Sequence, residues 1–359
     1  MSLSSEEKTQ YSRHLLLYEI GEVGQLKLKQ SKVLVIGAGG LGCPVLQYLT
    51  AAGIGTIGVI DHDVVEQSNL QRQILFTIAD IGLSKAECAV KRLRLLNPFI
   101  NFTSYSKKLS IDNAIKLFEN YDIIVDGTDN FPTRYLINDA AVITNKPIVF
   151  GSILKFEGQV SVLNFKNGPT YRCLFPVSPK PNEVPNCTDI GVLGILPGII
   201  GSLQANEVLK IVLGLGMVLS GKLLTFNALS MKQQVFSFEK NPSMVINALE
   251  ENYQAFCGIP NAIQEISYQE YIEQSSNFNV LDVRNQIERN EFHISSIHIP
   301  LDELSQRLHE IPDNKSLLVF CKSGLRSKLA VNKLLNEGFK NKVMGLKGGL
   351  SSDLYQNNK

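Results

Sequence analysis

The chain has 359 residues, 44% of them apolar, and a formal net charge of +1. This length suggests two or three domains, and a charge so close to zero argues against a nucleic acid or an anionic membrane surface as a partner. The polar stretch 1–14 lacks the apolar region of a signal peptide, and the longest near-apolar run, 190–203, contains Gly and Pro and is too short to span a bilayer. The six cysteines are scattered, unlike those of a secreted disulfide-rich protein, so we expect a cytoplasmic protein whose cysteines are packed or reactive.

The first part of the chain alternates predicted helices with predicted buried strands. An apolar stripe predicts helical structure within 1–30. A helix over 38–53 should stop at Gly53, and one over 84–98 should begin at Ser84 and stop before Pro98. Apolar runs, the first rich in β-branched residues, predict buried strands at 32–37, 54–61, 122–130 and 146–152. This alternation predicts an α/β fold with a parallel, doubly wound, Rossmann-like sheet.

The pattern changes after about residue 236. Residues 239–261 show no clear periodicity and contain two prolines, which indicates a linker. A second alternation of strand and helix begins at 266–284, continues at 315–339 and ends at 341–349. We therefore predict a first domain over 1–235, a linker over 236–262 and a small α/β domain over 263–359, which is a normal size for an independent domain.

A glycine motif lies between the first predicted strand and helix. Gly37, Gly39 and Gly42 form GxGxxG, in which the first glycine permits a tight turn, the second admits a phosphate and the third allows close packing. Asp61 ends the next strand, where an acid can bind a ribose hydroxyl. Taken alone, the motif favours an NAD-dependent oxidoreductase, or glycines that only satisfy the geometry of a turn.

The polar residues that follow argue for a different chemistry. Asn69, Arg72 and Lys85 follow the second strand, and Asp129 follows a later one, so all four should lie at one edge of the sheet. Hydride transfer does not need this set, whereas cleavage of a triphosphate does. Positive side chains neutralise the leaving pyrophosphate, and a carboxylate can hold magnesium. Each residue alone could be a solvated surface group, but together they favour the triphosphate site.

Four stretches, 37–55, 61–73, 126–139 and 191–210, resemble the MoeB/ThiF family of ubiquitin-activating-like enzymes, and the resemblance covers roughly residues 8–235. It implies a homodimer that uses ATP and magnesium to adenylate the C-terminal glycine of a ubiquitin-like sulfur carrier. It also implies that Asp129 holds the metal and that Arg13 reaches the ATP bound by the other subunit. The residues that it implies for the ATP site, with the glycines of the motif, are Gly37, Gly39, Gly40, Gly42, Asp61, Ser68, Asn69, Leu70, Gln71, Arg72, Lys85, Asp129 and Asn130.

Many relatives hold a structural zinc ion with two CxxC pairs, but this chain has Thr170 and Cys173 where the first pair would stand. Cys257 would still not complete four ligands, so we predict no structural zinc. The resemblance places Cys187 on a crossover loop, where it either forms a covalent link to the activated carrier or is an idle surface thiol. Cys43 and Cys88 are expected in the core.

A second reactive loop lies near the other end, in the stretch FCKSGLRSKLA (320–330). Loop amides and a helix N-terminus should converge on Cys321 and lower the pKa of its thiol, and Arg326 should add positive charge. Cysteine phosphatases have a loop one residue longer, so the smaller ring suits a terminal sulfur better than a phosphate ester. With the stretches 280–284, 291–301 and 346–350, this loop resembles a single-domain rhodanese, a sulfurtransferase, over roughly 263–353. Two departures, Ser296 and Asp353, affect packing more than the loop.

The leading hypothesis is therefore ATP-dependent adenylation of a ubiquitin-like sulfur carrier ending in Gly-Gly, followed by rhodanese-mediated sulfur transfer to give a thiocarboxylate. The sulfur would come from a persulfide donor such as a cysteine desulfurase. The alternatives are adenylation alone, with the rhodanese domain as a docking module, and an NAD-dependent oxidoreductase. The sequence leaves open whether the carrier serves molybdopterin synthesis, thiamine synthesis or tRNA thiolation.

Overall fold

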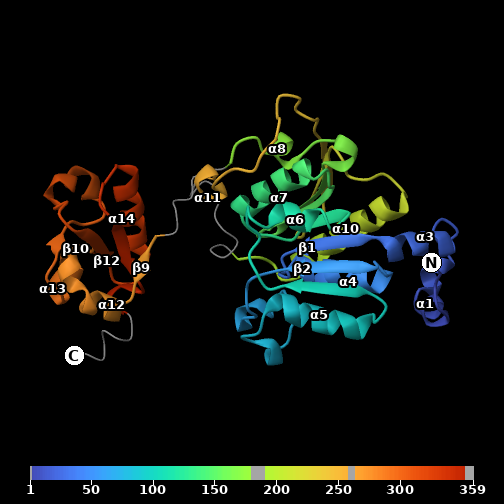
Figure 1. Ribbon diagram of the computed structural model, residues 1–359, viewed down its shortest axis with the longest axis horizontal. Coiled ribbons are helices and arrows are strands. Elements are labelled where there is room, and N and C mark those ends of the chain that lie inside the picture. The colour runs from blue at the N-terminus through green and yellow to red at the C-terminus, as the bar shows by residue number, and fades with distance from the viewer. Residues whose placement is uncertain (1, 179–190, 258–262, 352–359) are drawn as a thin grey trace. The chain divides into compact units, whose positions relative to one another are not determined.

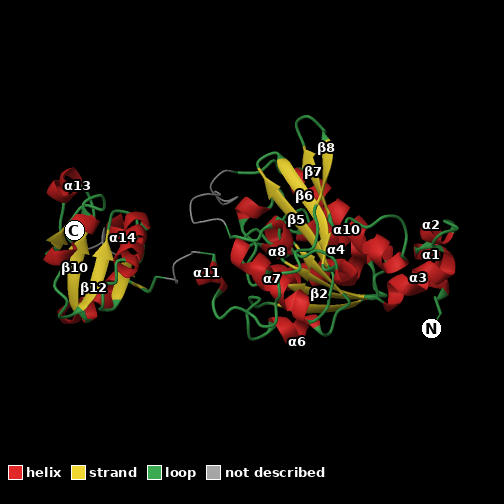
Figure 2. Ribbon diagram, turned by 90° about the horizontal axis from the view of Figure 1, so that it is seen from above, coloured by secondary structure: helices red, strands yellow, loops and turns green. Residues whose placement is uncertain are grey.

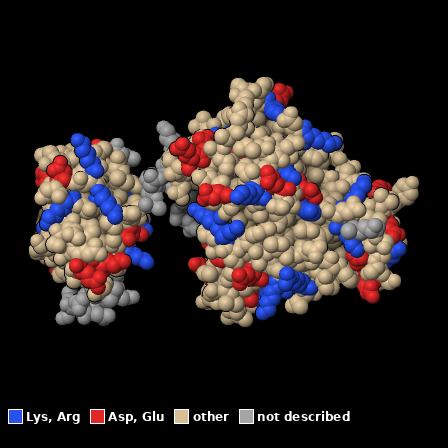
Figure 3. All heavy atoms as spheres, in the orientation of Figure 1, with Lys and Arg blue, Asp and Glu red and all other residues tan. Residues whose placement is uncertain are grey.

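The computed structural model describes residues 2–178, 191–257 and 263–351. The chain forms two compact units, Met1–Ile259 and Pro260–Lys359, and each is described by itself (Figure 1). Among the described residues, no helix is both long and apolar enough to cross a membrane. On the face drawn in Figure 3, basic and acidic side chains are interspersed, in keeping with the net charge of +1.

Within the described residues, the first unit contains an eight-stranded sheet in the order β3-β2-β1-β4-β5-β6-β7-β8. The strands are β1 Lys32–Ile36, β2 Thr56–Ile60, β3 Asn101–Tyr105, β4 Ile123–Asp126, β5 Ile148–Leu154, β6 Glu157–Leu163, β7 Lys222–Asn227 and β8 Gln233–Ser237. Strands β1 to β5 are parallel, as predicted. Strands β6, β7 and β8 extend the sheet in antiparallel fashion, which was not predicted. Only two residues, Lys155 and Phe156, join β5 to β6, so this connection cannot form the helical crossover that parallel strands require.

Helices cover both faces of this sheet (Figure 2). They are α1 Ser5–Gln10, α2 Ser12–Leu15, α3 Gly21–Gln30, α4 Gly42–Ala52, α5 Lys85–Leu96, α6 Ala114–Phe118, α7 Phe131–Ile143, α8 Tyr171–Leu174, α10 Leu196–Leu213 and α11 Tyr253–Phe256. As predicted, α4 ends at Gly53, whose φ is +90°, and the Ser84 hydroxyl caps α5 by accepting from the Glu87 amide.

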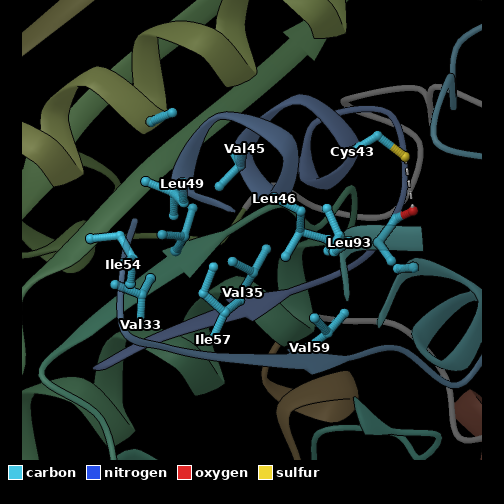
Figure 4. Packing of buried hydrophobic residues seen from close by; sticks show 14 of the residues in the cluster. Val33, Val35, Cys43, Val45, Leu46, Leu49, Ile54, Ile57, Val59 and Leu93 are labelled. Atoms are coloured by element: carbon cyan, nitrogen blue, oxygen red, sulfur yellow. Dashed lines mark hydrogen bonds between the residues drawn. The ribbon is translucent and has the colours of Figure 1, made fainter. Parts of the chain in front are cut away.

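The alternation of side chains along the strands divides the core into two layers. Val33 and Val35 of β1 face one side, where they pack with residues of α4, α5 and α10 (Figure 4). Leu34 and Ile36 face the other side and pack with residues of α6 and α7. A strand that is buried on both faces reads as a continuous apolar run, and this is why the sequence pattern predicted β1 correctly.

The second unit contains a five-stranded parallel sheet in the order β11-β10-β12-β13-β9. Its strands are β9 Glu265–Ile266, β10 Phe278–Asp282, β11 Ile297–His298, β12 Ser316–Phe320 and β13 Val343–Leu346. Its helices are α12 Tyr268–Glu273, α13 Gln286–Glu291 and α14 Leu325–Asn336. The side chains of Leu317 and Val319 pack in one apolar cluster and those of Leu318 and Phe320 in another, so both faces of β12 are covered.

A buried ionic network connects the end of the first unit to two of its helices. Some of its residues lie in the range 236–262, which was predicted to be a linker. The guanidinium of Arg172 donates to both carboxylate oxygens of Asp139, at 2.8 and 2.7 Å, and also to Glu250 at 3.0 Å. The hydroxyl of Tyr253 donates to Asp139 at 2.7 Å. The charge centre of Arg172 lies 4.4 Å from the ring centroid of Phe256. These contacts join residues 250–256 to α7 and α8, so this part of the predicted linker is packed on the first unit.

We expect Asp139→Ala to destabilise the first unit by about 3–5 kcal/mol, because it leaves the Arg172 charge buried without its partner. Urea unfolding followed by far-ultraviolet circular dichroism measures the effect. Glu250→Gln is the control, since Glu250 is 43% exposed and its pair with Arg172 should contribute less than about 1 kcal/mol. If both variants lost the same free energy of unfolding, this would contradict our inference that the buried Arg172–Asp139 pair contributes most of the stabilisation.

Candidate active sites

A pocket of about 1000 Å³ lies beside the carboxyl ends of strands β1, β2 and β4. It is a usual location for a ligand in a doubly wound sheet. The structure places most of the sequence-predicted ATP-site residues in its lining: Gly37, Gly39, Gly40, Asp61, Ser68, Gln71, Arg72, Lys85, Asp129 and Asn130. Gly42, Asn69, Leu70 and Arg13 are not among the residues that line it.

The three glycines of the motif have different roles. Gly37 has a φ of +93°, and a Cβ there would lie 2.9 Å from the carbonyl oxygen of Gly127. A Cβ on Gly42 would lie 1.9 Å from the carbonyl oxygen of Gly37, so Gly42 permits the turn without lining the pocket. A Cβ on Gly39 would meet only the Gln73 amide nitrogen, at 3.7 Å, within the 4 Å considered. Gly39 therefore leaves open space in the pocket, where a phosphate could approach the backbone.

Asp61 organises the floor of the pocket through backbone contacts. One carboxylate oxygen accepts from the amide of Ala38, and the other accepts from the amide of Asp63, both at 2.8 Å. Asp63 in turn accepts from the Lys85 ammonium at 3.0 Å, and the Lys85 side chain is only 8% exposed. The sequence analysis missed Asp63, although its place two residues after Asp61 was a visible signal.

The segment after Asp63 carries both a pocket residue and a residue that shapes the turn. Arg72 lines the pocket, and its guanidinium donates to the carbonyl of Ser68 at 3.1 Å. Asn69 is buried, and its side-chain oxygen Oδ1 accepts from the amide of Glu66 at 3.2 Å. It thereby holds the 3₁₀ turn Gln67–Asn69. Asn69 is not among the residues that line the pocket, and its backbone carbonyl accepts from the Arg72 amide at 3.0 Å.

The loop after β4 supplies the acidic side of the pocket. Asp129 is exposed, and among the described residues it has no hydrogen bond or ion pair. Asn130 caps α7 by accepting from the amide of Thr133 at 3.1 Å. Asp126 is buried, and burial raises the pKa of its carboxyl. Arg134, which the sequence analysis did not select, donates to the carbonyl of Thr128 at 2.9 Å and lines the pocket.

Two parts of the wall were not predicted. Lys107 and Lys108 follow β3 and line the pocket, and the adjacent lysines after a strand were a signal that the sequence offered. Residues 251–254 line it as well, although they were assigned to a linker. No local pattern could have placed them there, because the Tyr253–Asp139 contact joins residues 114 positions apart.

The cysteines of the first unit are all free thiols where the structure describes them. Cys43 and Cys88 lie in the core, as predicted, and Figure 4 shows the Cys43 thiol directed at a carbonyl oxygen, that of Ala38 at 3.4 Å. Cys173 lies 3.4 Å from the Thr170 hydroxyl and accepts from the amide of Asn241 at 3.4 Å. Cys187 lies outside the described residues.

We expect the zinc content per chain to be near zero, because Cys173 has Thr170 in place of a second thiol. Within the described residues, the one group of three side chains close enough to share a metal ion is Asp61, His62 and Asp63, which offers no thiolate. Metal analysis of protein purified without a histidine tag tests this prediction. Stoichiometric zinc would contradict it and would direct attention first to Cys173 and Cys257.

The second unit contains a cysteine cradle at the carboxyl end of β12. The Cys321 side chain is buried, and its sulfur accepts from the amides of Gly324 at 3.2 Å and Ser327 at 3.4 Å. Gly324 has a φ of +87°, a conformation that turns the loop into α14. A Cβ on Gly349 would lie 2.5 Å from the Cys321 carbonyl oxygen, so the glycine pair of 346–350 is packed tightly against the loop.

Arg326 was expected to add its charge to this cradle. Its two terminal nitrogens donate to the two carboxylate oxygens of Glu288, both at 2.6 Å. These hydrogen bonds lower the pKa of Glu288 to about 2. Glu288 was not selected from the sequence, since a glutamate in a short polar helix carries no distinguishing local signal.

Comparisons with known proteins identify the two domains that contain these sites. The chain matches the model of the ThiF family over residues 11–246 and that of the rhodanese-like domain over residues 267–353. It is 40% identical to "Probable adenylyltransferase/sulfurtransferase MoeZ" of Mycobacterium tuberculosis over 97% of this chain and 93% of that protein. It is 47% identical to "Sulfur carrier protein adenylyltransferase" of Thermus thermophilus over 72% of this chain and all of that protein.

A solved structure supports the fold of the first unit. The crystal structure of Escherichia coli MccB with MccA-N7isoASN aligns with 68% of this chain and 75% of that one, with a TM-score of 0.60 and 24% sequence identity. From the family model and the relatives together, the chain belongs to the ThiF family and carries a C-terminal rhodanese-like domain.

Proposed function

We propose that the two activities of this chain, adenylyltransferase and sulfurtransferase, act in sequence on one substrate, a ubiquitin-like sulfur carrier ending in Gly-Gly. The observation that carries the proposal is the presence, in one chain, of a pocket lined by Arg72, Lys85 and Asp129 and of a cysteine held by backbone amides. The name of the Thermus thermophilus relative supports a sulfur carrier as the substrate.

The first reaction is proposed for the pocket. The carrier carboxylate attacks the α-phosphorus of ATP, and pyrophosphate leaves with the electron pair of the broken P–O bond. Both reactants are anionic, so Arg72 and Lys85 would offset their repulsion and stabilise the charge of the leaving group. Asp61 would bind the ribose, and Gly39 would admit the phosphates to the backbone amides.

Asp129 is the candidate ligand for magnesium. Its exposed carboxylate has no partner among the described residues, and carboxylate oxygen is a ligand type that this ion prefers. Magnesium, when bound, would neutralise phosphate charge. We also propose a homodimer in which Arg13, which does not line the pocket of its own chain, serves the pocket of the other subunit.

The second reaction is proposed for Cys321. Its thiolate takes a sulfur atom from a persulfide donor, such as a cysteine desulfurase, and the terminal sulfur then attacks the adenylated carbonyl. AMP leaves, and the carrier is joined to Cys321 through a disulfide bond. A second thiolate must attack the Cys321 sulfur of this bond, so that the thiocarboxylate leaves with the electron pair and a new disulfide forms on Cys321. Cys187 is the candidate within the chain, and an external thiol would then reduce the Cys187–Cys321 disulfide.

Two rival functions have weaker support. If the protein only adenylated its substrate and used the rhodanese unit for docking, the amide cradle around Cys321 would be unexplained. An NAD-dependent oxidoreductase leaves Arg72, Lys85 and Asp129 unexplained.

We expect the protein to bind ATP and not NAD, and Gly39→Ala to weaken ATP binding by about tenfold or more, because the added methyl group occupies the space left for a phosphate. The fold should be retained, since that methyl group meets only the Gln73 amide within 4 Å. Isothermal titration calorimetry measures the binding affinity for ATP and for NAD, and thermal unfolding shows whether the variant is folded. NAD binding in preference to ATP would contradict the proposal.

A further inference from the structure

The charge of Arg326 is balanced at the cradle by a carboxylate from a different helix. Arg326 lies in the first turn of α14, directly before Ser327, whose amide contacts the Cys321 sulfur. Its bidentate pair with Glu288 of α13 is only partly exposed, at 33% for the arginine and 18% for the glutamate. The contact is therefore less screened than a surface pair.

Two other guanidinium groups are paired with a carboxylate at the carboxyl end of β10. Arg284 donates to both oxygens of Asp282, at 3.0 and 2.8 Å, and Arg289 lies 3.5 Å from the same carboxylate. Lys322, next to Cys321, is exposed, so solvent screens its ammonium. The Cys321 sulfur thus accepts from neutral amide groups, and Arg326, the partly buried cation that follows the loop, is already paired with Glu288.

We propose that Glu288 sets the charge preference of the Cys321 site and disfavours sulfur donors that carry two negative charges on the group being attacked. A dianion such as thiosulfate needs a free cation to offset its charge. Arg326 is the candidate cation, and it is already paired with Glu288. A protein persulfide brings at most one negative charge to the cradle, so the pair opposes it less. This inference rests on the proposed role of Cys321 in sulfur transfer.

The chemistry of the two donor types differs only in the leaving group. In each case the Cys321 thiolate attacks the outer sulfur of the donor, and the donor's S–S bond breaks. Sulfite leaves with the electron pair from thiosulfate, and a thiolate leaves from a persulfide. Both reactions give the same Cys321 persulfide. The donors therefore differ in their charge, and this is the property on which the charge of Glu288 would act.

Glu288 is negatively charged at neutral pH. Hydrogen bonds from Arg326 hold the pKa of Glu288 at about 2, so the carboxylate stays ionised far below neutral pH. Glutamine can replace it with little effect on the helix. Glu288 forms a capping box with Asn285, and either Glu or Gln serves at this position of the box.

The test compares thiosulfate, a dianion, with methanethiosulfonate, a monoanion in which a methyl group replaces one charged oxygen. Full-length protein is assayed with cyanide as acceptor, and thiocyanate is measured. Glu288→Gln should raise kcat/KM for thiosulfate by about five- to tenfold, through KM, and change that for methanethiosulfonate less than about twofold. The gain should shrink in about 0.5 M NaCl, because salt screens the freed charge of Arg326.

Two further variants make the result decisive. Glu291→Gln removes the same charge from an exposed residue of the same helix and should leave the ratio of the two donors unchanged. Arg326→Gln removes the cation and should lower the ratio of thiosulfate to methanethiosulfonate activity, which tests the inference even if Glu288→Gln fails to fold. A donor ratio unchanged by both Glu288→Gln and Arg326→Gln would overturn the inference alone. If the wild-type protein transferred sulfur from neither thiosulfate nor methanethiosulfonate, the proposed function of Cys321 would be overturned as well.

Discussion

Cys321→Ala should reduce thiocarboxylate formation at least about a thousandfold, since the variant lacks the only sulfur atom held in the amide cradle. The same variant should exchange pyrophosphate into ATP at the wild-type rate. Adenylation needs the pocket of the first unit and the carrier carboxylate, and the described residues that line that pocket belong to the first unit. Mass spectrometry of the carrier after a single turnover, with thiosulfate or a persulfide as donor, measures the sulfur transfer.

The control for this experiment is Cys173→Ala. Cys173 is a free thiol outside both sites, so its loss should change neither pyrophosphate exchange nor thiocarboxylate formation. A carrier that the Cys321→Ala protein converts completely to thiocarboxylate would rule out the proposed role of the loop.

Cys187→Ala distinguishes two routes for release of the product. If Cys187 breaks the disulfide between carrier and Cys321, its loss should leave adenylation intact and make the joined species accumulate. If an external thiol does this, thiocarboxylate should form at nearly the wild-type rate. The mass of the joined species separates the two routes directly.

Arg72→Ala and Asp129→Ala should each lower carrier-dependent pyrophosphate exchange by about 10²- to 10³-fold, because each removes a group placed to balance charge on the phosphates. Exchange of labelled pyrophosphate into ATP measures the loss. The free energy of unfolding should change little, since among the described residues the Arg72 side chain makes one hydrogen bond, to the Ser68 carbonyl, and the Asp129 side chain makes none.

Arg94→Ala is the matched control for Arg72. Arg94 is exposed on α5 and does not line the pocket, and among the described residues its side chain makes a single hydrogen bond, to the carbonyl of Phe102 at 3.4 Å. Exchange by the Arg94 variant should equal that of the wild type. Normal exchange by both Arg72→Ala and Asp129→Ala would mean that the pocket does not adenylate the carrier.

The sequence alone was enough to predict the parallel core of the first unit. Strands buried on both faces must be apolar throughout, so β1, β2, β4 and β5 appear as short continuous runs. The caps of α4 and α5 follow from single residues, Gly53 and Ser84, whose effect is local. The glycine motif and the Cys321 loop were equally visible, because each is a contiguous segment whose chemistry depends on its own backbone.

Only the tertiary structure decided which side chains meet across long separations. Asn69 remains a predicted ATP-site residue, and the structure adds that it is buried and that its side-chain oxygen accepts from the Glu66 amide. Tyr253 lay in a stretch without periodicity, and its contact with Asp139 brings that stretch to the wall of the pocket. Arg326 looked like a free cation, and Glu288 pairs with it from 38 positions away. Such contacts depend on how helices pack on a sheet, and no local pattern of apolar and polar residues encodes that packing.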